Sequence, residues 1–233
     1  MQRDTWAALA VLIFALAFAA SPLLVPDFGG FDPQAFPIPQ VDPPVQPEGY
    51  AFAIWGVIFL WLVVGAGYGM AARRADPTWT AMRVPLALSL AVGAVWLPVA
   101  TISPVWATIL IWAMLVPALA ALFAAPREAA WAAAWPVGLY AGWLSAASCV
   151  AIGLLLGGYG FLSMPAAAYL MILIAIALAC AVQWQLRRAP TYGIAAIWAL
   201  VAVGVQNGFA GPGLLAVIGA TVLLVPTVRA ARL

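Results

Sequence analysis

PVWATILIWAMLVPALAALFAA, residues 104–125, decides the class of fold because it contains no charged side chain. A membrane-spanning helix needs about 20 consecutive apolar residues, and this stretch has that length. Further apolar runs, each bounded by Pro, Gly or Arg, follow along the chain. Since only closed backbone hydrogen bonding survives in lipid, we expect helices near 6–25, 50–71, 84–102, 104–125, 129–156, 165–186, 192–208 and 212–229.

The composition gives the same class independently. Of the 233 residues, 67% are hydrophobic and 7% are charged, and the mean hydropathy is +1.09. A soluble domain has about 25% charged residues. We therefore predict an all-α integral membrane protein, a bundle of about eight transmembrane helices whose main partner is the lipid bilayer.

The same counts exclude several chemistries. The chain has no histidine, which removes the imidazole base and His-ligated metals or haem. Its net charge of +2 is too small to indicate the basic surface that binds nucleic acid. We expect no resident cofactor, no metal and no conventional catalytic acid–base pair. An enzyme is disfavoured.

The basic residues indicate an orientation. All nine are arginines, and with eight spans each falls in the N-terminus, an even-numbered loop or the C-terminus. The positive-inside rule then places both termini in the cytoplasm, which suits a bacterial inner-membrane protein. The first apolar run is expected to be a retained helix. The alternative is a signal peptide cleaved after Ala17-Phe18-Ala19, which would leave seven spans.

The first external loop, residues 26–49, differs in composition from the rest of the chain. It contains four of the seven acidic residues and seven prolines. Proline fixes φ and removes backbone donors, so the loop is expected to be extended. Two interpretations stay open: a lid over a binding site, or a solvated acidic loop.

Tryptophan is the unusual excess, with twelve in the chain. Trp6, Trp79, Trp106, Trp131 and Trp184 lie near predicted span ends, where indole rings are common. Seven others lie deeper and would either pack between helices or line a pocket for a flat apolar ligand. The deeper set is Trp55, Trp61, Trp96, Trp112, Trp135, Trp143 and Trp198.

Small residues recur at four-residue spacing in three places. Gly138, Gly142 and Ala146 form a ridge on the fifth span. The pairs at 65/69 and 153/157 repeat the spacing. Such ridges let helices approach closely, either within one chain or in a homodimer.

Three motifs resemble one family. The loop ends in Pro-Pro-Val-Gln-Pro-Glu-Gly-Tyr50-Ala-Phe52-Ala-Ile-Trp55, the third span carries Trp96, and the fifth carries Tyr140-Ala-Gly-Trp143. Together they resemble the tryptophan-rich sensory protein/translocator protein (TspO/MBR) family, over roughly residues 1–156.

The resemblance implies a five-helix core, residues 1–156, often dimeric. The remaining residues, 157–233, are expected to form a three-helix extension outside the family pattern, which would make the chain an extended, divergent member. The resemblance also implies a pocket beneath the first loop that takes a tetrapyrrole such as protoporphyrin IX, a sterol or drug-like molecules. The family pattern differs at three positions: Tyr50 replaces a Trp, and Gly93 and Ala151 replace Asn. Carried over by position, the expected ligand-binding residues are Tyr50, Phe52, Trp55, Trp96, Tyr140 and Trp143.

The leading hypothesis is a membrane receptor or sensor that binds a planar hydrophobic ligand in an aromatic intramembrane pocket. No ionisable residue lies in the middle of a predicted span, which argues against an ion-coupled transporter. The alternatives are a facilitated carrier of a small hydrophobic molecule and a structural subunit of a larger complex. Photochemical degradation of a porphyrin is conceivable only by analogy with the family.

Overall fold

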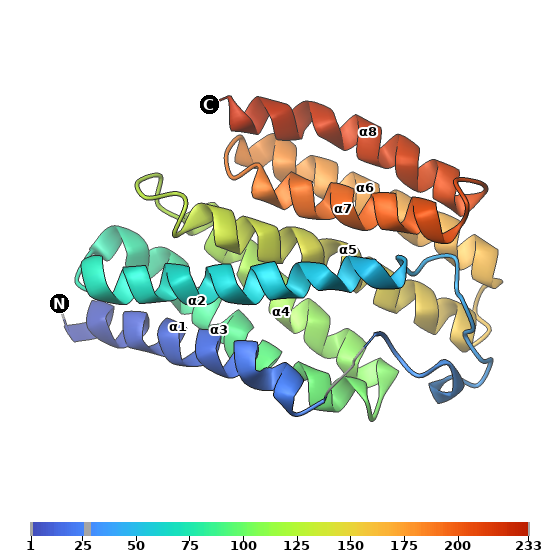
Figure 1. The fold of residues 1–233 in the computed structure, drawn as a ribbon, viewed down its shortest axis with the longest axis horizontal. Coiled ribbons are helices and arrows are strands. Elements are labelled where there is room, and N and C mark those ends of the chain that lie inside the picture. The colour runs from blue at the N-terminus through green and yellow to red at the C-terminus, as the bar shows by residue number, and fades with distance from the viewer. Residues whose placement is uncertain (1, 26–28, 233) are drawn as a thin grey trace.

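The computed structural model describes residues 2–25 and 29–232, and every regular element in these ranges is helical. Eight α-helices follow one another along this part of the chain (Figure 1). Three short 3₁₀ turns, η1, η2 and η3, lie between the first two helices at Ser21–Leu23, Pro33–Ala35 and Gly49–Ala53. The helices are α1 (Gln2–Ala20), α2 (Ile54–Ala72), α3 (Pro77–Ala100), α4 (Pro104–Ala124), α5 (Ala134–Gly158), α6 (Met164–Leu186), α7 (Thr191–Gln206) and α8 (Pro212–Ala231).

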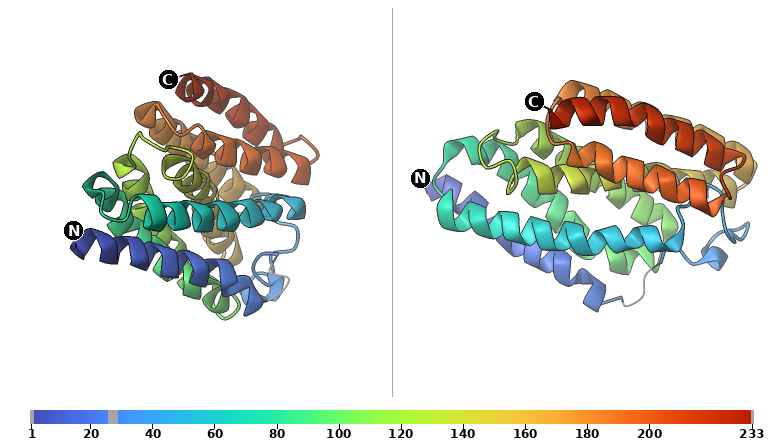
Figure 2. Two further views of the ribbon diagram at one scale, coloured as in Figure 1. Left: turned by 60° about the vertical axis from the view of Figure 1, so that its left-hand side comes forward. Right: turned by 45° about the horizontal axis from the view of Figure 1, so that its top comes forward.

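The helices run up and down in one bundle, so that α1 begins and α8 ends at the same end (Figures 1 and 2). The connections that carry the arginines lie at this end, which we call the basic end. The Pro-rich loop lies at the other end. Helix α5 is the centre of the bundle and packs against α2, α4, α6 and α7. The all-helical membrane bundle predicted from the sequence is confirmed.

Seven of the eight helices are long and apolar enough to cross a bilayer. Helix α7, with 16 residues, is shorter than the about 20 that a span requires. It is nevertheless apolar and is held between α5 and α8. The chain is therefore an integral membrane protein with seven full-length candidate spans and one short apolar helix among the described residues.

Two predicted helix starts were wrong. Helix α3 begins at Pro77, not at 84, because Asp76 caps it by accepting a hydrogen bond from the Thr78 N–H at 3.0 Å. Helix α5 begins at Ala134, not at 129, because residues 126–133 form turns. Arg83, expected in a loop, thus lies within α3 and is 2% exposed.

Arg83 is buried because it completes the end of a neighbouring helix. Its guanidinium donates to the carbonyl oxygens of Gly69 and Arg73 at 2.9 and 2.8 Å, where α2 ends, and to that of Arg74 at 3.3 Å. The last carbonyls of a helix have no partner within it, and they carry partial negative charge. The ring of Trp79 lies 5.4 Å from the guanidinium carbon. Trp79, expected at the membrane interface, is buried for the same reason.

The glycine ridges pack within the chain. A Cβ on Gly138 or Gly142 would overlap Thr191 or the carbonyl of Tyr192, so this ridge fits α5 against α7. Gly65 fits against the carbonyl of Ala132 in the connection from α4 to α5. Each of these contacts lets two backbones approach closely. A homodimer stays a prediction that does not draw on these glycines.

Candidate apolar ligand site

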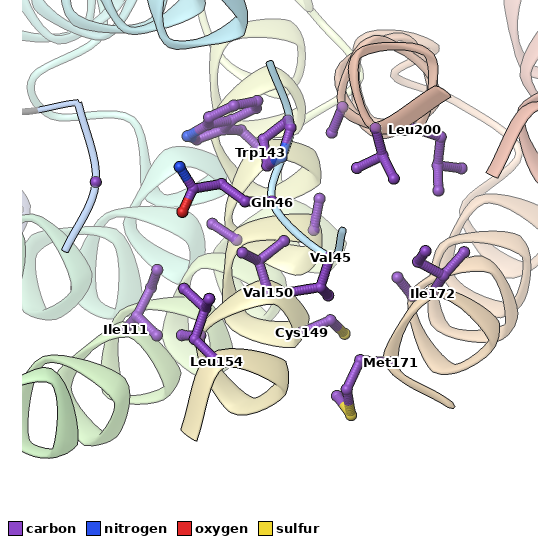
Figure 3. A pocket seen from close by; sticks show the side chains of 18 of the residues that line it. Val45, Gln46, Ile111, Trp143, Cys149, Val150, Leu154, Met171, Ile172 and Leu200 are labelled. Carbon is purple, nitrogen blue, oxygen red and sulfur yellow. The ribbon is translucent and has the colours of Figure 1, made fainter. Parts of the chain in front are cut away.

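An apolar cavity of about 80 Å³ lies beneath the Pro-rich loop, between the loop-end halves of α5, α6 and α7 (Figure 3). Its walls come from seven segments of the chain: the loop, η3, α3, α4, the middle of α5, α6 and α7. No residue of the lining is charged. The lining consists of Gly30, Phe31, Val45, Gln46, Pro47, Phe52, Trp96, Ile111, Trp143, Ala146, Ala147, Cys149, Val150, Ala151, Leu154, Met171, Ile172, Ala175, Ala199, Leu200 and Val203.

The aromatic wall of the cavity is built from three predicted site residues. Trp143 on α5 is 2% exposed, so its indole turns inward. The ring of Phe52 meets it edge to face, with the centroids 5.8 Å apart. Trp96 on α3 is fixed by its Nε1–H, which donates to the carbonyl of Ala107 on α4 at 2.9 Å. The hydrogen bond restricts rotation of the Trp96 indole, whereas the ring of Phe52 is held by packing.

The loop forms the roof of the cavity and is anchored by its apolar side chains. Val45 and Phe36 are buried. A Cβ on Gly153 would lie 2.8 Å from Val45, and one on Gly158 would overlap the ring of Phe36. The glycine spacing near the end of α5 therefore accommodates the loop. The backbone joins in, since the Ile38 N–H donates to the carbonyl of Gly158 at 2.9 Å.

Helix α7 holds the second half of the roof. Asn207 donates from Nδ2 to the carbonyl of Pro44 at 3.0 Å, and the Glu48 N–H donates to the carbonyl of Ala202 at 3.2 Å. Trp198 donates from Nε1 to the carbonyl of Ala51 at 3.0 Å. Hydrogen bonds to the α7 region thus hold the loop in place over the cavity. This arrangement supports the lid interpretation over that of a solvated loop.

A second space lies beside the cavity, towards α1. It is a cleft of about 240 Å³ whose lining is largely apolar and carries no charged side chain. Its residues come from the end of α1, η1 and its flank, η3, α2 and the end of α3. They are Phe18, Pro22, Val25, Phe52, Trp55, Phe59, Trp96 and Leu97. Phe52 and Trp96 belong to both the cleft and the cavity.

Three of the six predicted site residues lie outside the cavity. Trp55 lines the cleft and stacks on Phe59 at 5.2 Å. Tyr140 lies below the cavity with its hydroxyl 2.9 Å from Oγ of Ser89, and lines neither space. Tyr50 is 45% exposed and contacts Trp198 edge-on at 5.5 Å. The structure thus brings Phe52, Trp96 and Trp143 together at the cavity.

The two positions that lack the family's asparagines differ in surroundings. Ala151 lines the cavity, so an amide there would reach a ligand. Gly93 packs against the ring of Phe18. A Cβ on Gly93 would lie 2.9 Å from the nearest carbon of that ring, so an asparagine side chain has no room there. Gln46, from the loop, supplies the one carboxamide of the lining (Figure 3). The sequence analysis missed Gln46.

The sequence motifs did not indicate that the last helices contribute to the cavity lining either. Met171 and Ile172 on α6 and Leu200 on α7 form the wall opposite Trp143 (Figure 3). Their only sequence signal is apolar character, which every span shares. Cys149 on α5 also lines the cavity.

The fold and the cavity define an all-helical integral membrane protein with an aromatic apolar cavity under a closed loop. A family model described as TSPO-like protein matches residues 35–229, which is most of the chain. The chain therefore belongs to the TspO/MBR family. The match begins within the loop and continues through α8, beyond the boundary at residue 156 drawn from the motifs. Nothing among the curated proteins or the solved structures matches the chain.

Proposed function

We propose that the protein is a membrane receptor or sensor that binds an uncharged, largely apolar molecule in the cavity beneath the loop. The observation that carries the proposal is the lining itself, which combines Trp143, Phe52 and Trp96 with one carboxamide, Gln46, and no charge. Sites for small molecules are concave and mostly apolar, with few polar groups to set orientation. Each Å² of apolar ligand surface buried there contributes about 25 cal/mol.

The chemistry of the lining favours a sterol-like ligand over a tetrapyrrole, the two ligand classes that the family resemblance implies. A tetrapyrrole such as protoporphyrin IX carries two propionates, and burying a carboxylate without a partner is costly. The arginines gather at the basic end of the bundle, whereas the cavity lies beneath the loop at the other end. A sterol-like molecule with one hydroxyl suits the lining better, because Gln46 can donate to or accept from that hydroxyl.

The volume of the cavity is smaller than a ligand needs. Its volume is about 80 Å³, whereas small-molecule sites measure roughly 300–1,000 Å³. Binding therefore requires lining side chains or the loop to move outward. This supports a receptor whose loop position reports occupancy.

The carrier alternative needs a path through the bundle, and two polar contacts obstruct it. The Ser89–Tyr140 and Ser145–Tyr192 pairs, each 2.9 Å between oxygens, are fully buried on the basic side of the cavity. They lie in the interior between the cavity and the basic end. We propose that the basic end faces the cytoplasm of a bacterial inner membrane, as its arginines indicate.

A binding measurement tests the proposal. A fluorescent sterol, dehydroergosterol, is titrated into the purified protein while energy transfer from tryptophan is recorded, and protoporphyrin IX is titrated in parallel. We expect saturable sterol binding that Ala147→Phe weakens at least tenfold, because the new ring fills the cavity. Val57→Phe on the exposed face of α2 is the matched control and should bind as the wild type does.

Two results would contradict the proposal. Equal sterol binding by Ala147→Phe and the control would place the sterol elsewhere. Tighter binding of protoporphyrin IX than of the sterol, with the same loss in Ala147→Phe, would assign the cavity to the charged ligand instead.

A further inference from the structure

The cleft beside α1 and the cavity under the loop share two side chains of their linings. Phe52 and Trp96 are the residues that line both spaces. The cleft is lined by Phe18, Trp55 and Phe59 in addition, and it contains no polar or charged side chain apart from the indoles. An apolar molecule in the cleft is therefore one side chain away from the cavity.

The two shared side chains are not held alike. The indole of Trp96 is tied to α4 through the carbonyl of Ala107 at 2.9 Å. Phe52 is a hydrocarbon ring on the 3₁₀ turn η3, and its ring is held by packing against Trp143 at 5.8 Å between centroids. A packed ring can turn without breaking a hydrogen bond. Trp96 is thus the fixed side of the partition and Phe52 the movable side.

Entry from above would have to undo the roof. The side chains of Val45 and Phe36 would lose their packing against α5, and the hydrogen bonds donated by Asn207 and Glu48 would break. That change breaks two hydrogen bonds and exposes two buried side chains, whereas a turn of the Phe52 ring breaks no hydrogen bond. Opening the roof is therefore a larger rearrangement than turning one ring.

The outer surface next to the cleft is suited to a lipid-soluble molecule. Leu23 and Leu24, beside the cleft's Pro22 and Val25, are 84% and 69% exposed. Leu60 on α2 is 67% exposed. In a membrane protein such exposed apolar side chains face acyl chains rather than water. The cleft is therefore flanked in sequence by residues that face the acyl chains.

We propose that the cleft is a second binding site, an entry site that takes uncharged apolar molecules from the bilayer and passes them to the cavity when Phe52 turns. The proposal rests on the proposed function, since it supplies that cavity with its ligand. It names the route and the residue that controls it.

The thiol of Cys149 provides a direct test because it lines the cavity. In a Cys180→Ser background it is the one thiol of the chain. The protein is placed in lipid vesicles, and the rate of Cys149 modification is measured by mass spectrometry with two reagents. One is N-phenylmaleimide, which is neutral and dissolves in the bilayer. The other is a sulfonated methanethiosulfonate, which is charged and stays in water.

We expect N-phenylmaleimide to react with Cys149 and the charged reagent to react at least tenfold more slowly. Phe52→Ala joins the cleft to the cavity and should raise the N-phenylmaleimide rate at least tenfold. Phe52→Leu, which keeps much of the packing, should give an intermediate rate. Asn207→Ala is the matched control, since it removes a hydrogen bond to the loop carbonyl of Pro44, and Asn207 lines neither the cavity nor the cleft.

A faster rate in Asn207→Ala, with no change in Phe52→Ala, would overturn the proposal in favour of entry through the loop. Equal rates for the two reagents would overturn it as well. So would the absence of reaction in both wild type and Phe52→Ala. The sterol titration is a separate readout: a failure there with the expected labelling pattern would reject the ligand and keep the route.

Discussion

The hydroxyl of Tyr140 on α5 lies 2.9 Å from Oγ of Ser89 on α3, in a part of the bundle with no solvent access. Ser89 has one proton and donates it to the carbonyl of Met114 on α4 at 2.7 Å. Tyr140 must therefore be the donor to Ser89. This small network links three helices immediately below the cavity.

The direction of that bond predicts an asymmetry between two variants. Tyr140→Phe removes a donor and leaves Ser89 bonded to Met114, so the loss should be about 0.6 kcal/mol, as for an average bond between membrane helices. Ser89→Ala leaves the Tyr140 hydroxyl buried without its acceptor, which costs about 1–3 kcal/mol.

Unfolding of the purified variants in detergent measures both losses. The control is Thr221→Ala, which removes an exposed hydroxyl on α8 and should change the unfolding free energy by less than about 0.5 kcal/mol. A larger loss in Tyr140→Phe than in Ser89→Ala would show that the bond runs the other way.

The positions of the helices could be predicted because each span is a long apolar run. The starts of α3 and α5 could not. Arg83 was assigned to a loop since a charge inside a span is costly, and nothing in the sequence shows that the end of α2 supplies its carbonyl partners. Gln183 is likewise fully buried, and its Oε1 accepts from the Gly193 N–H at 2.7 Å in the first turn of α7.

The site was predictable in part for the same reason. Trp143, Phe52 and Trp96 were identified by motif spacing, and they meet at one wall. The opposite wall, Met171 and Leu200, comes from helices in which every apolar residue looks alike in the sequence. Which of them faces a cavity depends on how α6 and α7 pack against α5, and this is fixed only by tertiary contacts.

Arg83 should be essential for joining α2 to α3. Arg83→Gln removes the charge and the fork of donors, so the last carbonyls of α2 lose their partners and the protein should lose about 1–3 kcal/mol. Arg83→Lys should recover only part of the loss, because one ammonium group cannot match the guanidinium fork. Arg127→Gln, at an exposed position in the α4–α5 connection, is the control. Chemical unfolding that ranks Arg83→Gln level with this control would reject the interpretation.

Acid should weaken the start of α3. A hydrogen bond from the Thr78 hydroxyl, at 2.7 Å, holds the pKa of Asp76 below its usual 3.8. A carboxyl with a lowered pKa contributes stability that is present above pH about 4 and is lost as the pH falls through the lowered value. The difference in melting temperature between wild type and Asp76→Ala should therefore be largest above pH 4 and shrink below it. A difference that grows on acidification would contradict this assignment.

The roof should loosen when its bond to α7 is removed. Asn207→Ala loses the hydrogen bond to the carbonyl of Pro44, and we expect hydrogen exchange to quicken at the amides of Ile38, Gln40 and Glu48. Exchange in the middle of α5 should stay as slow as in the wild type, because no contact there is lost. Gln34→Ala, at an exposed position of the loop, is the control. Unchanged exchange in Asn207→Ala would show that apolar packing alone holds the loop.

Two glycines in similar helical positions should respond to the same substitution with opposite signs. At Gly142 a Cβ would overlap the carbonyl oxygen of Tyr192 and approach Ala195 Cβ to 3.1 Å, so α5 and α7 must separate. Overpacking of this kind costs about 1–3 kcal/mol. At Gly67 on α2 a Cβ meets nothing within 4 Å, and alanine should stabilise the helix by roughly 0.5–1 kcal/mol. Melting temperatures of Gly142→Ala and Gly67→Ala, measured in the same detergent, check this pair of predictions. Sterol binding should fall in Gly142→Ala alone, because the cavity wall that contains Leu200 moves with α7. Two variants that shift in the same direction would show that the closeness of α5 and α7 does not set the stability of this bundle.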